Sequence, residues 1–206
     1  MQPIVGIVDY QSGNIRSVAN AAENAGGAVR DVRVPADLAA CTHLILPGVG
    51  AFGFCAERLR SSGLLPALEQ WALRDAKPLM GICVGMQLLA AYSEEHGRQE
   101  GLGWIGGTVR KLENAGDGGV RIPHVGWNEV EFTQPLGQFR VGDVANFYFD
   151  HSYAYDAPDS DSEVGRCRHG RTFSALIRRN NILAAQFHPE KSQAQGMRVL
   201  KAFFAC

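Results

Sequence analysis

Residues Lys77–Tyr92 read KPLMGICVGMQLLAAY, and this stretch indicates the fold of the whole chain. The apolar run Leu79–Ile82 is short and stops at a glycine-flanked cysteine, which favours a buried strand. After the cysteine, apolar residues recur at helical spacing, at Val84, Leu88, Leu89 and Tyr92. Cys83 is therefore expected on a sharp turn between a strand and a helix, which is the sequence form of a nucleophile elbow.

The two glycines beside the cysteine support this interpretation. Gly81 and Gly85 leave room for the close backbone approach that such a turn requires. A thiol at the start of a helix faces the positive end of the helix dipole, and this favours the reactive thiolate. A small buried cysteine beneath an ordinary turn is the alternative. The glycines and the strand–turn–helix context favour Cys83 as a nucleophile.

The first half of the sequence alternates between strand-like and helical segments. Strands are expected at 4–8, 28–32, 43–46 and 79–82. Helices are expected at 14–24, 52–61 and 64–76, and Gly26 and Gly27 end the first of them. Strands separated by helices of this length predict a parallel sheet with right-handed crossovers.

The second half changes character after the glycine-rich residues 101–107. Short strands separated by turn residues are expected at 108–112, 129–132, 147–149, 164–168, 174–177 and 182–185, and a closing helix at 192–204. The segment NAGDGG at 114–119 is expected to form a mobile hairpin or loop. The predicted fold class is α/β: one domain, residues 1–206, with a central, mostly parallel sheet flanked by helices and an additional, partly antiparallel strand region in the second half.

The composition excludes several classes of protein. The chain has 206 residues, 46% of them apolar and 20% charged, with a formal net charge of −1, which is ordinary for a globular protein. Scattered Lys and Arg residues argue against nucleic-acid binding, and the lack of a long apolar stretch argues against a membrane span. Five cysteines without CxxC spacing argue against a disulfide framework or a zinc site. We therefore expect a cytoplasmic protein without a metal ion.

A cysteine nucleophile needs a base that takes its proton and a carboxylate that orients the base. Among six histidines, His188 stands out because it follows the strand-like run Ile182–Phe187. The carboxyl ends of parallel strands form one edge of a sheet, so Cys83 and His188 are expected to meet there. Glu190, two residues further on across Pro189, can orient the imidazole. A capped strand end with a solvated glutamate is the alternative for this segment taken alone.

An oxyanion hole is the third requirement, because backbone N–H groups must stabilise the negative oxygen of a tetrahedral intermediate. The N–H group of Val84 directly follows the nucleophile and can supply one donor. The other donor is expected from LPGVGAFG, residues Leu46–Gly53, at the end of another strand, with Val49 or Gly50 as the donor. A plain glycine turn is the alternative for this segment.

Three motifs in this order, PGVGAFG, GICVGMQLL and QFHPEKS, resemble those of the class I glutamine amidotransferases. Four further stretches are similar to the glutaminase subunits of imidazole glycerol phosphate synthases: VDYQSGNIRSV, GLGWIGGTVRKL, IPHVGWNEV and FYFDHSYA. The resemblance extends from about residue 4 to the C-terminus. It implies hydrolysis of L-glutamine to glutamate and ammonia through a cysteine thioester, without a cofactor.

The resemblance also implies a role for each matching position. In the catalytic triad, Cys83 matches the nucleophile, His188 the general base and Glu190 the acid that orients the base. Gln87 matches a residue that helps to hold the substrate, and a solvated helix residue is the alternative. The segment whose backbone lies along the amino and carboxyl end of glutamine is matched by His151, Ser152 and Tyr153. An ordinary strand edge is the alternative for that segment.

A partner is implied as well, namely a cyclase with a (β/α)8 barrel that forms a heterodimer with the glutaminase and receives its ammonia. With that ammonia the cyclase makes imidazole glycerol phosphate and an aminoimidazole carboxamide ribotide. Trp127, Asn128 and Lys191 match the surface that docks on the cyclase. A core tryptophan and an exposed lysine are the alternatives, since tryptophan serves both cores and interfaces.

Some positions depart from the family pattern, namely Asp150, Ala184 and the helical segment GFCAERLR at 53–60. These departures leave open a paralogue that feeds a different synthase, such as one that makes nitrogen-rich surface sugars. A stand-alone thiol hydrolase of γ-glutamyl peptides and a regulatory subunit without turnover are further alternatives.

Overall fold

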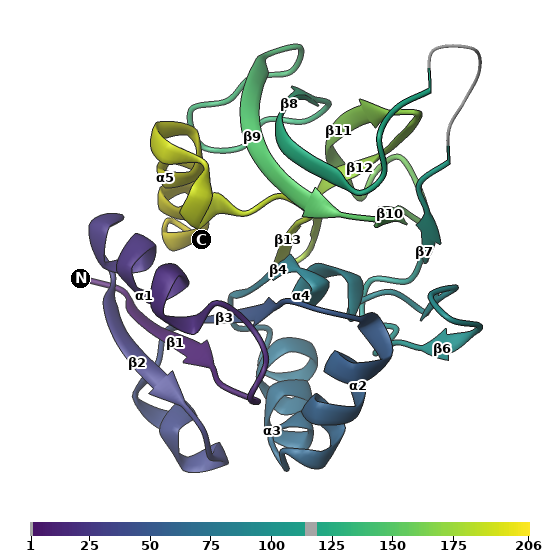
Figure 1. Ribbon diagram of the computed structural model, residues 1–206. Coiled ribbons are helices and arrows are strands. Elements are labelled where there is room, and N and C mark those ends of the chain that lie inside the picture. Colours follow the sequence, from purple (N-terminus) through teal and green to yellow (C-terminus); the bar gives the residue numbers. More distant parts are fainter. Residues whose placement is uncertain (1, 114–118) are drawn as a thin grey trace.

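A nine-stranded mixed sheet runs through the computed structural model, which describes residues 2–113 and 119–206 (Figure 1). The strand order in its parallel half is β2 (Ala28–Val32), β1 (Ile4–Val8), β3 (His43–Gly48), β4 (Leu79–Cys83) and β13 (Ile182–Ala185). Every residue of β3, β4 and β13 is buried, as is usual where helices cover both faces of a parallel sheet. The predicted parallel sheet is confirmed.

Antiparallel strands extend the same sheet beyond β13. In order they are β12 (Arg171–Arg179), β11 (Glu163–His169), β8 (His124–Phe132) and β9 (Val144–His151). Buried and more exposed positions alternate along β8 and β9, as expected where one face of a sheet meets solvent. The predicted α/β class with a partly antiparallel second half is confirmed. β8 and β9 are each five residues longer than predicted (9 and 8 residues against 4 and 3). In the missed part of β8 the usual pattern is reversed, because Val125 and Trp127 are exposed while His124 is buried.

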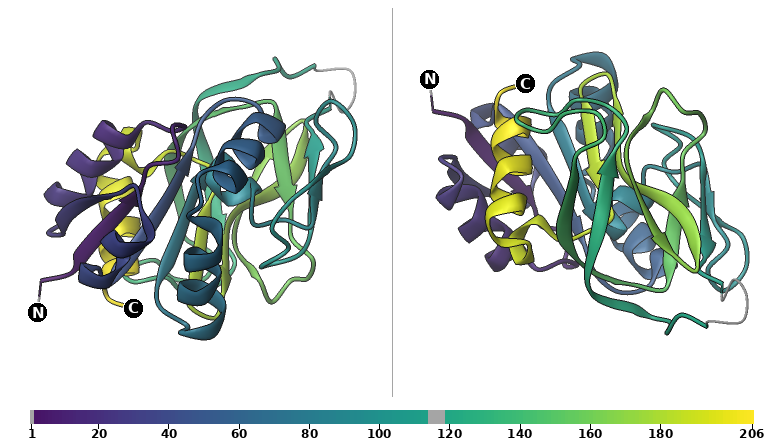
Figure 2. Two further views of the ribbon diagram at one scale, coloured as in Figure 1. Left: turned by 90° about the horizontal axis from the view of Figure 1, so that it is seen from below. Right: turned by 90° about the horizontal axis from the view of Figure 1, so that it is seen from above.

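Helices lie on both faces of the parallel half (Figures 1 and 2). α1 (Ile15–Asn24) and α5 (Gln193–Phe204) pack together on one face, and α2 (Phe52–Ser61) and α3 (Leu65–Glu69) lie on the other. α3 continues as a π-helix, and a 3-10 helix connects β2 with β3; their bounds are Gln70–Arg74 and Pro35–Ala40. None of the helices in the described ranges is long and apolar enough to cross a membrane.

A second, smaller sheet lies beside the main one. Its strand order is β10 (Tyr153–Asp156), β7 (Thr108–Lys111), β5 (Tyr92–Ser93) and β6 (Gln99–Glu100). Of these four strands, the sequence predicted β7 alone. β5 and β6 have two residues each, which is too short to show a periodicity. The loop expected at 114–119 falls on residues 114–118, which lie outside the described ranges.

The helix expected after Cys83 is wrong beyond its first turn. α4 spans Val84–Gln87, and the chain then leaves the helical path. The carbonyl groups of residues 88–91 accept hydrogen bonds from N–H groups of residues 101–105. Gly101 makes this packing possible, since a Cβ atom there would lie 2.1 Å from the carbonyl oxygen of Ala90. Tertiary hydrogen bonds thus override the helical spacing of the apolar residues.

Candidate active site

Cys83 lies at the carboxyl end of β4 on a sharp strand-to-helix turn, as predicted. Its backbone has φ 54° and ψ −113°, a strained conformation that costs a non-glycine residue about 1–3 kcal/mol. A Cβ atom at Gly85 would lie 1.9 Å from the carbonyl oxygen of Leu46, and one at Gly81 would lie 2.8 Å from that of Gly85. The two glycines therefore let α4 pack directly against β3 and β4, and this packing holds the turn.

His188 follows β13 by three residues, and β13 pairs with β4. Its N–H group donates to the carbonyl of Tyr148 at 2.9 Å, and its own carbonyl accepts from Ser192 Oγ at 2.6 Å. Nδ1 of the ring lies 2.8 Å from Oε1 of Glu190, whose side chain is 1% exposed. Glu190 therefore orients the ring and leaves Nε2 available to the cavity.

The neighbours of His188 stabilise its charged form. Burial lowers the pKa of the ring, but the neighbouring Cys83 sulfur and the hydrogen-bonded Glu190 carboxylate outweigh burial and raise the pKa to about 10. A buried carboxylate on one side of the ring and a sulfur on the other favour an imidazolium beside the nucleophile. The arrangement supplies both a nucleophile and a proton donor.

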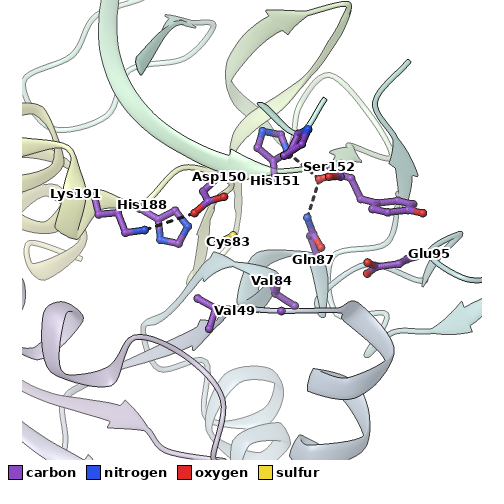
Figure 3. Close-up of a pocket in the computed structure, with 13 residues that line it drawn as sticks. Val49, Cys83, Val84, Gln87, Glu95, Asp150, His151, Ser152, His188 and Lys191 are labelled. Atoms are coloured by element: carbon purple, nitrogen blue, oxygen red, sulfur yellow. Dashed lines mark hydrogen bonds and ion pairs between the residues drawn. The ribbon is translucent and has the colours of Figure 1, made fainter. Parts of the chain in front are cut away.

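A cavity of about 360 Å³ opens in front of Cys83 and His188 (Figure 3). The residues that the sequence singled out and that line it are Val49, Gly50, Cys83, Val84, Gln87, His151, Ser152, Tyr153, His188 and Lys191. Glu190 contacts His188 from behind, and Trp127 and Asn128 lie outside the lining. The structure thus brings the predicted catalytic and substrate-binding positions together.

The glycine loop after β3 lies next to the nucleophile, because Gly48 pairs with Cys83 across β3 and β4. The carbonyl of Val49 accepts hydrogen bonds from Ser12 Oγ at 3.0 Å and from Cys55 Sγ at 3.4 Å. A trans peptide directs a carbonyl and the next N–H group to opposite sides, so the N–H group after Val49 points away from these two donors. Of the two expected loop donors, this conformation favours Gly50.

Gln186 is a site residue that the sequence reasoning missed. It is fully buried, and its Nε2 atom donates to Cys83 Sγ at 3.8 Å while its Oε1 atom accepts from Gln87 Nε2 at 3.0 Å. Gln87 also donates to the carbonyl of Tyr153 at 2.9 Å. The signal was the position of Gln186 at the start of QFHPEKS, where a buried strand end carries a polar side chain.

Glu95 is the second missed residue. It lines the cavity at the end away from His188 (Figure 3), and its Oε2 atom accepts the N–H group of Phe52 at 2.6 Å. This bond ties the loop after β5 to the start of α2. No sequence signal marked Glu95, because it follows a stretch that was expected to be helical.

The three predicted docking residues are accessible. Trp127 is 48% exposed, so it is not a core residue. Asn128 is half-buried, and Lys191 is exposed at the rim of the cavity. Lys191 Nζ lies 3.8 Å from a carboxylate oxygen of Asp150 and 5.2 Å from the ring centre of Tyr148.

A cysteine on an elbow, an imidazole fixed by a carboxylate and a cavity in front of both define a thiol-hydrolase site on an α/β sheet. The sequence profile of the family described as Glutamine amidotransferase class-I matches residues 6–206. The chain belongs to this family.

Relatives agree with this assignment, and solved structures share the fold. The chain is 42% identical over 208 residues to the imidazole glycerol phosphate synthase subunit HisH of Rhodospirillum rubrum, with 97% of each chain covered. It is 42% identical to the subunit of the same name from Zymomonas mobilis, with 97% of this chain and 94% of that protein covered. A solved glutamine amidotransferase superposes with a TM-score of 0.76 at 20% identity, covering 98% of this chain and 97% of that one. For PurLQS from Thermotoga maritima the TM-score is 0.74 at 19% identity, with 100% and 99% covered.

Proposed function

We propose that this chain is a glutaminase subunit that hydrolyses L-glutamine to glutamate and ammonia and passes the ammonia to an imidazole glycerol phosphate cyclase. Relatives that carry the name of a subunit of that synthase align with it over nearly their full length. One observation carries the chemistry: Cys83 and His188 line the same cavity, and Glu190 lies 2.8 Å behind His188.

The reaction begins with attack of the Cys83 thiolate on the side-chain carbonyl carbon of glutamine. A C–S bond forms while the carbonyl π electrons move to oxygen, where N–H groups of Val84 and Gly50 stabilise the charge. The carbonyl then re-forms, the C–N bond breaks, and the His188 imidazolium gives its proton to the departing nitrogen. Ammonia leaves, and a γ-glutamyl thioester remains.

Hydrolysis of the thioester restores the site. Neutral His188 takes a proton from water, whose oxygen attacks the thioester carbonyl. When this intermediate collapses, the C–S bond breaks and the electron pair returns to Cys83 as thiolate. Glutamate leaves, and His188 is again an imidazolium held by Glu190.

The far end of the cavity suits the charged end of glutamine. The Glu95 carboxylate can pair with the substrate ammonium group, because a charge-assisted hydrogen bond is stronger than a neutral one. The backbone of Ser152 and Tyr153 lies along the same wall. Gln87 holds the Tyr153 carbonyl and so contributes to the shape of this wall.

A docked partner is proposed because free ammonia in water near neutral pH takes up a proton and is then no nucleophile. The resemblance to glutaminase subunits of imidazole glycerol phosphate synthases implies that this partner is a cyclase with a (β/α)8 barrel. Trp127, Asn128 and Lys191 are proposed to contact it. Val125 is 56% exposed on the same strand as Trp127, and exposed apolar side chains of this kind favour an interaction surface.

We further propose that residues 1–206 form one amidotransferase domain that works in the cytoplasm without a cofactor. The family match covers residues 6–206, and one sheet runs through both halves of the chain. All five cysteines are free, which fits a reducing compartment.

The test uses the complex of this chain with the co-purified cyclase subunit. Cys83→Ala should abolish product formation from glutamine and leave product formation from ammonium salts unchanged. Cys206→Ala, which removes an exposed thiol away from the cavity, should leave both activities intact. Undiminished glutamine hydrolysis by Cys83→Ala would refute the assignment, and failure of any barrel cyclase to accept the ammonia would refute the pathway.

A further inference from the structure

Three of the six histidines gather beside the cavity, apart from His188. His124 lies on β8, His151 at the end of β9 and His169 at the end of β11. The His124 ring is stacked on Phe149, with centroids 4.6 Å apart, and on His169, with centroids 3.9 Å apart. No group of side chains within residues 2–113 and 119–206 is arranged to hold a metal ion. The cluster therefore calls for another explanation.

A continuous chain of hydrogen bonds runs through two of these histidines. Asn128 Nδ2 lies 3.1 Å from His124 Nε2, and His124 Nδ1 lies 3.0 Å from His151 Nε2. His151 Nδ1 lies 2.8 Å from the carbonyl oxygen of Tyr153, which also accepts from Gln87. These hydrogen bonds thus connect Asn128, a half-buried residue proposed to contact the cyclase, with groups that line the cavity.

The two ends of the chain fix the position of every proton in it. An amide nitrogen donates and a carbonyl oxygen accepts. His151 must therefore carry its proton on Nδ1, facing Tyr153, and accept at Nε2. His124 must then also carry its proton on Nδ1 and accept at Nε2. Both rings are neutral in this arrangement, and a second proton on either ring would leave a donor facing a donor.

The orientation of the Asn128 amide is fixed independently. Its Nδ2 atom also donates to the carbonyl of Arg168 at 3.1 Å, and its Oδ1 atom accepts the N–H group of Glu129 at 2.8 Å. The amide therefore presents a donor, and not an acceptor, to His124.

The surroundings of both rings favour the neutral form. The pKa of His124 is lowered to about 3, mainly by burial and to a smaller extent by the neighbouring His151 and His169. Burial also lowers the pKa of His151 to about 4, and charges on His169 and His188 act in the same direction. The Tyr153 carbonyl and Asp150 act in the opposite direction without outweighing burial.

We propose that Asn128, His124 and His151 form a positioning relay that holds the Tyr153 carbonyl, and with it Gln87, in the geometry that binds glutamine. The relay also connects Asn128, which is proposed to contact the cyclase, by hydrogen bonds with the part of the cavity wall formed by Tyr153 and Gln87. The proposal rests on the glutaminase function proposed above.

Two nearly isosteric substitutions of His124 distinguish its hydrogen bond with His151 from its hydrogen bond with Asn128. In His124→Asn the side-chain amide replaces Nδ1 and keeps the donor to His151, whereas in His124→Gln the amide reaches the Nε2 position and keeps the contact with Asn128. Both variants lose the same ring stacking. We expect His124→Gln to raise KM for glutamine about five- to tenfold, the effect of one lost hydrogen bond, with a much smaller change in kcat. His124→Asn should stay within about twofold of the native KM.

A double-mutant cycle tests the hydrogen bond between Asn128 and His124. Asn128→Asp replaces the donor by a carboxylate. Because burial keeps the His124 ring neutral, the carboxylate draws the single proton of the ring to Nε2 and leaves Nδ1 without a proton to donate to His151. This substitution should raise KM about fivefold in the native background and leave KM unchanged in the His124→Asn background. Equal KM values for His124→Gln and His124→Asn, or an equal effect of Asn128→Asp in both backgrounds, would overturn the relay.

Nitrogen-15 NMR of the full-length chain tests the proton positions without reference to catalysis. Both His124 and His151 should be neutral and protonated on Nδ1 at pH 6. A proton on Nε2 of either ring would overturn the relay even if glutamine is hydrolysed. Absence of glutamine hydrolysis by the native complex would refute the proposed function instead, and the tautomers would still decide the relay.

Discussion

The two halves of the sheet shift the pKa of a buried histidine in opposite directions. In the parallel half, Cys83 and Glu190 raise the pKa of His188 to about 10, so the ring keeps its proton for chemistry. In the antiparallel half, burial is the main cause that lowers the pKa of His151 to about 4. The ring therefore stays neutral and can accept a hydrogen bond as well as donate one. Similar burial therefore gives a charged ring where a sulfur and a carboxylate face it, and a neutral ring where a carbonyl and a second imidazole face it.

The halves also differ in how they hold their residues. The parallel half uses close backbone contacts at Gly81 and Gly85 to fix one strained turn. The antiparallel half uses side-chain hydrogen bonds that cross from β8 to β9 and on to β10. We therefore expect substitutions in the first region to affect folding and chemistry, and substitutions in the second to affect substrate binding.

The largest effect is expected for Gly85→Ala. The new methyl group would meet the Leu46 carbonyl oxygen at 1.9 Å, and backbone on both sides cannot move without disrupting β3 or α4. The free energy of unfolding should fall by about 3 kcal/mol or more. Chemical denaturation measures it, with Gly119→Ala as the control because, within residues 2–113 and 119–206 and apart from its chain neighbours, nothing lies within 4 Å of a Cβ atom there. A loss below about 1 kcal/mol would mean that the elbow is not held by this contact.

Glu190→Gln should have the next largest effect. The amide keeps the size of the side chain but removes the charge that stabilises the His188 imidazolium, so fewer molecules hold the proton needed by the leaving ammonia. We expect kcat for glutamine hydrolysis to fall on the order of 100-fold, or about 2.7 kcal/mol, while KM changes little. Steady-state kinetics at pH 8 measures both. A native kcat would mean that the carboxylate has no part in catalysis.

The sequence was most informative in the parallel half. Strand ends there coincide with glycines and with Cys83, and buried parallel strands read as short apolar runs, so β1, β2 and β13 were predicted with their observed bounds and β3 and β4 within two residues. His188 and Glu190 could be predicted because parallel strands end at one edge of the sheet.

Three features could not be predicted from local sequence. α4 ends after Gln87 because N–H groups of residues 101–105 donate hydrogen bonds to the carbonyl groups of residues 88–91, which local sequence patterns do not reveal. Glu95 lines the cavity from the loop after β5, at a position that no periodicity marks. The relay through His124 depends on the register of β8 and β9, which places His124 opposite His151.

The pH dependence of stability sharpens the contrast between the histidines. The pKa of His188 is raised. Its contribution to the free energy of unfolding is therefore complete below pH 6.5 and is lost as the pH rises through about 10. The pKa of His151 is lowered. Its contribution to the free energy of unfolding is therefore present above pH 6.5 and is lost as the pH falls towards about 4.

Two variants should therefore deviate from the native protein in opposite directions between pH 8 and pH 5. His188→Asn should lose more unfolding free energy than the native chain on acidification, and His151→Asn should lose less, each by up to about 2 kcal/mol. Urea titrations at the two pH values measure the difference. Deviations of the same sign would contradict the opposite environments of the two rings.

The smallest effect is expected for Asp150→Asn. Its ion pair with Lys191 is 3.8 Å long, and both side chains are more than one-third exposed, so water and salt screen it. Stability should change by less than about 1 kcal/mol and KM for glutamine by less than about twofold. Thermal unfolding and kinetics measure both. A tenfold change in KM would show that this departure from the family pattern shapes the substrate site.

The central claim is that Cys83 carries the substrate while His188 and Glu190 move the proton. The most direct measurement is mass spectrometry of the native complex, quenched with acid during turnover of glutamine and digested to peptides. A γ-glutamyl adduct should appear on the peptide that contains Cys83 and should be missing from the other cysteine peptides. Continued glutamine hydrolysis with the adduct on another residue, or with none on Cys83 under conditions that trap thioesters, would contradict the account.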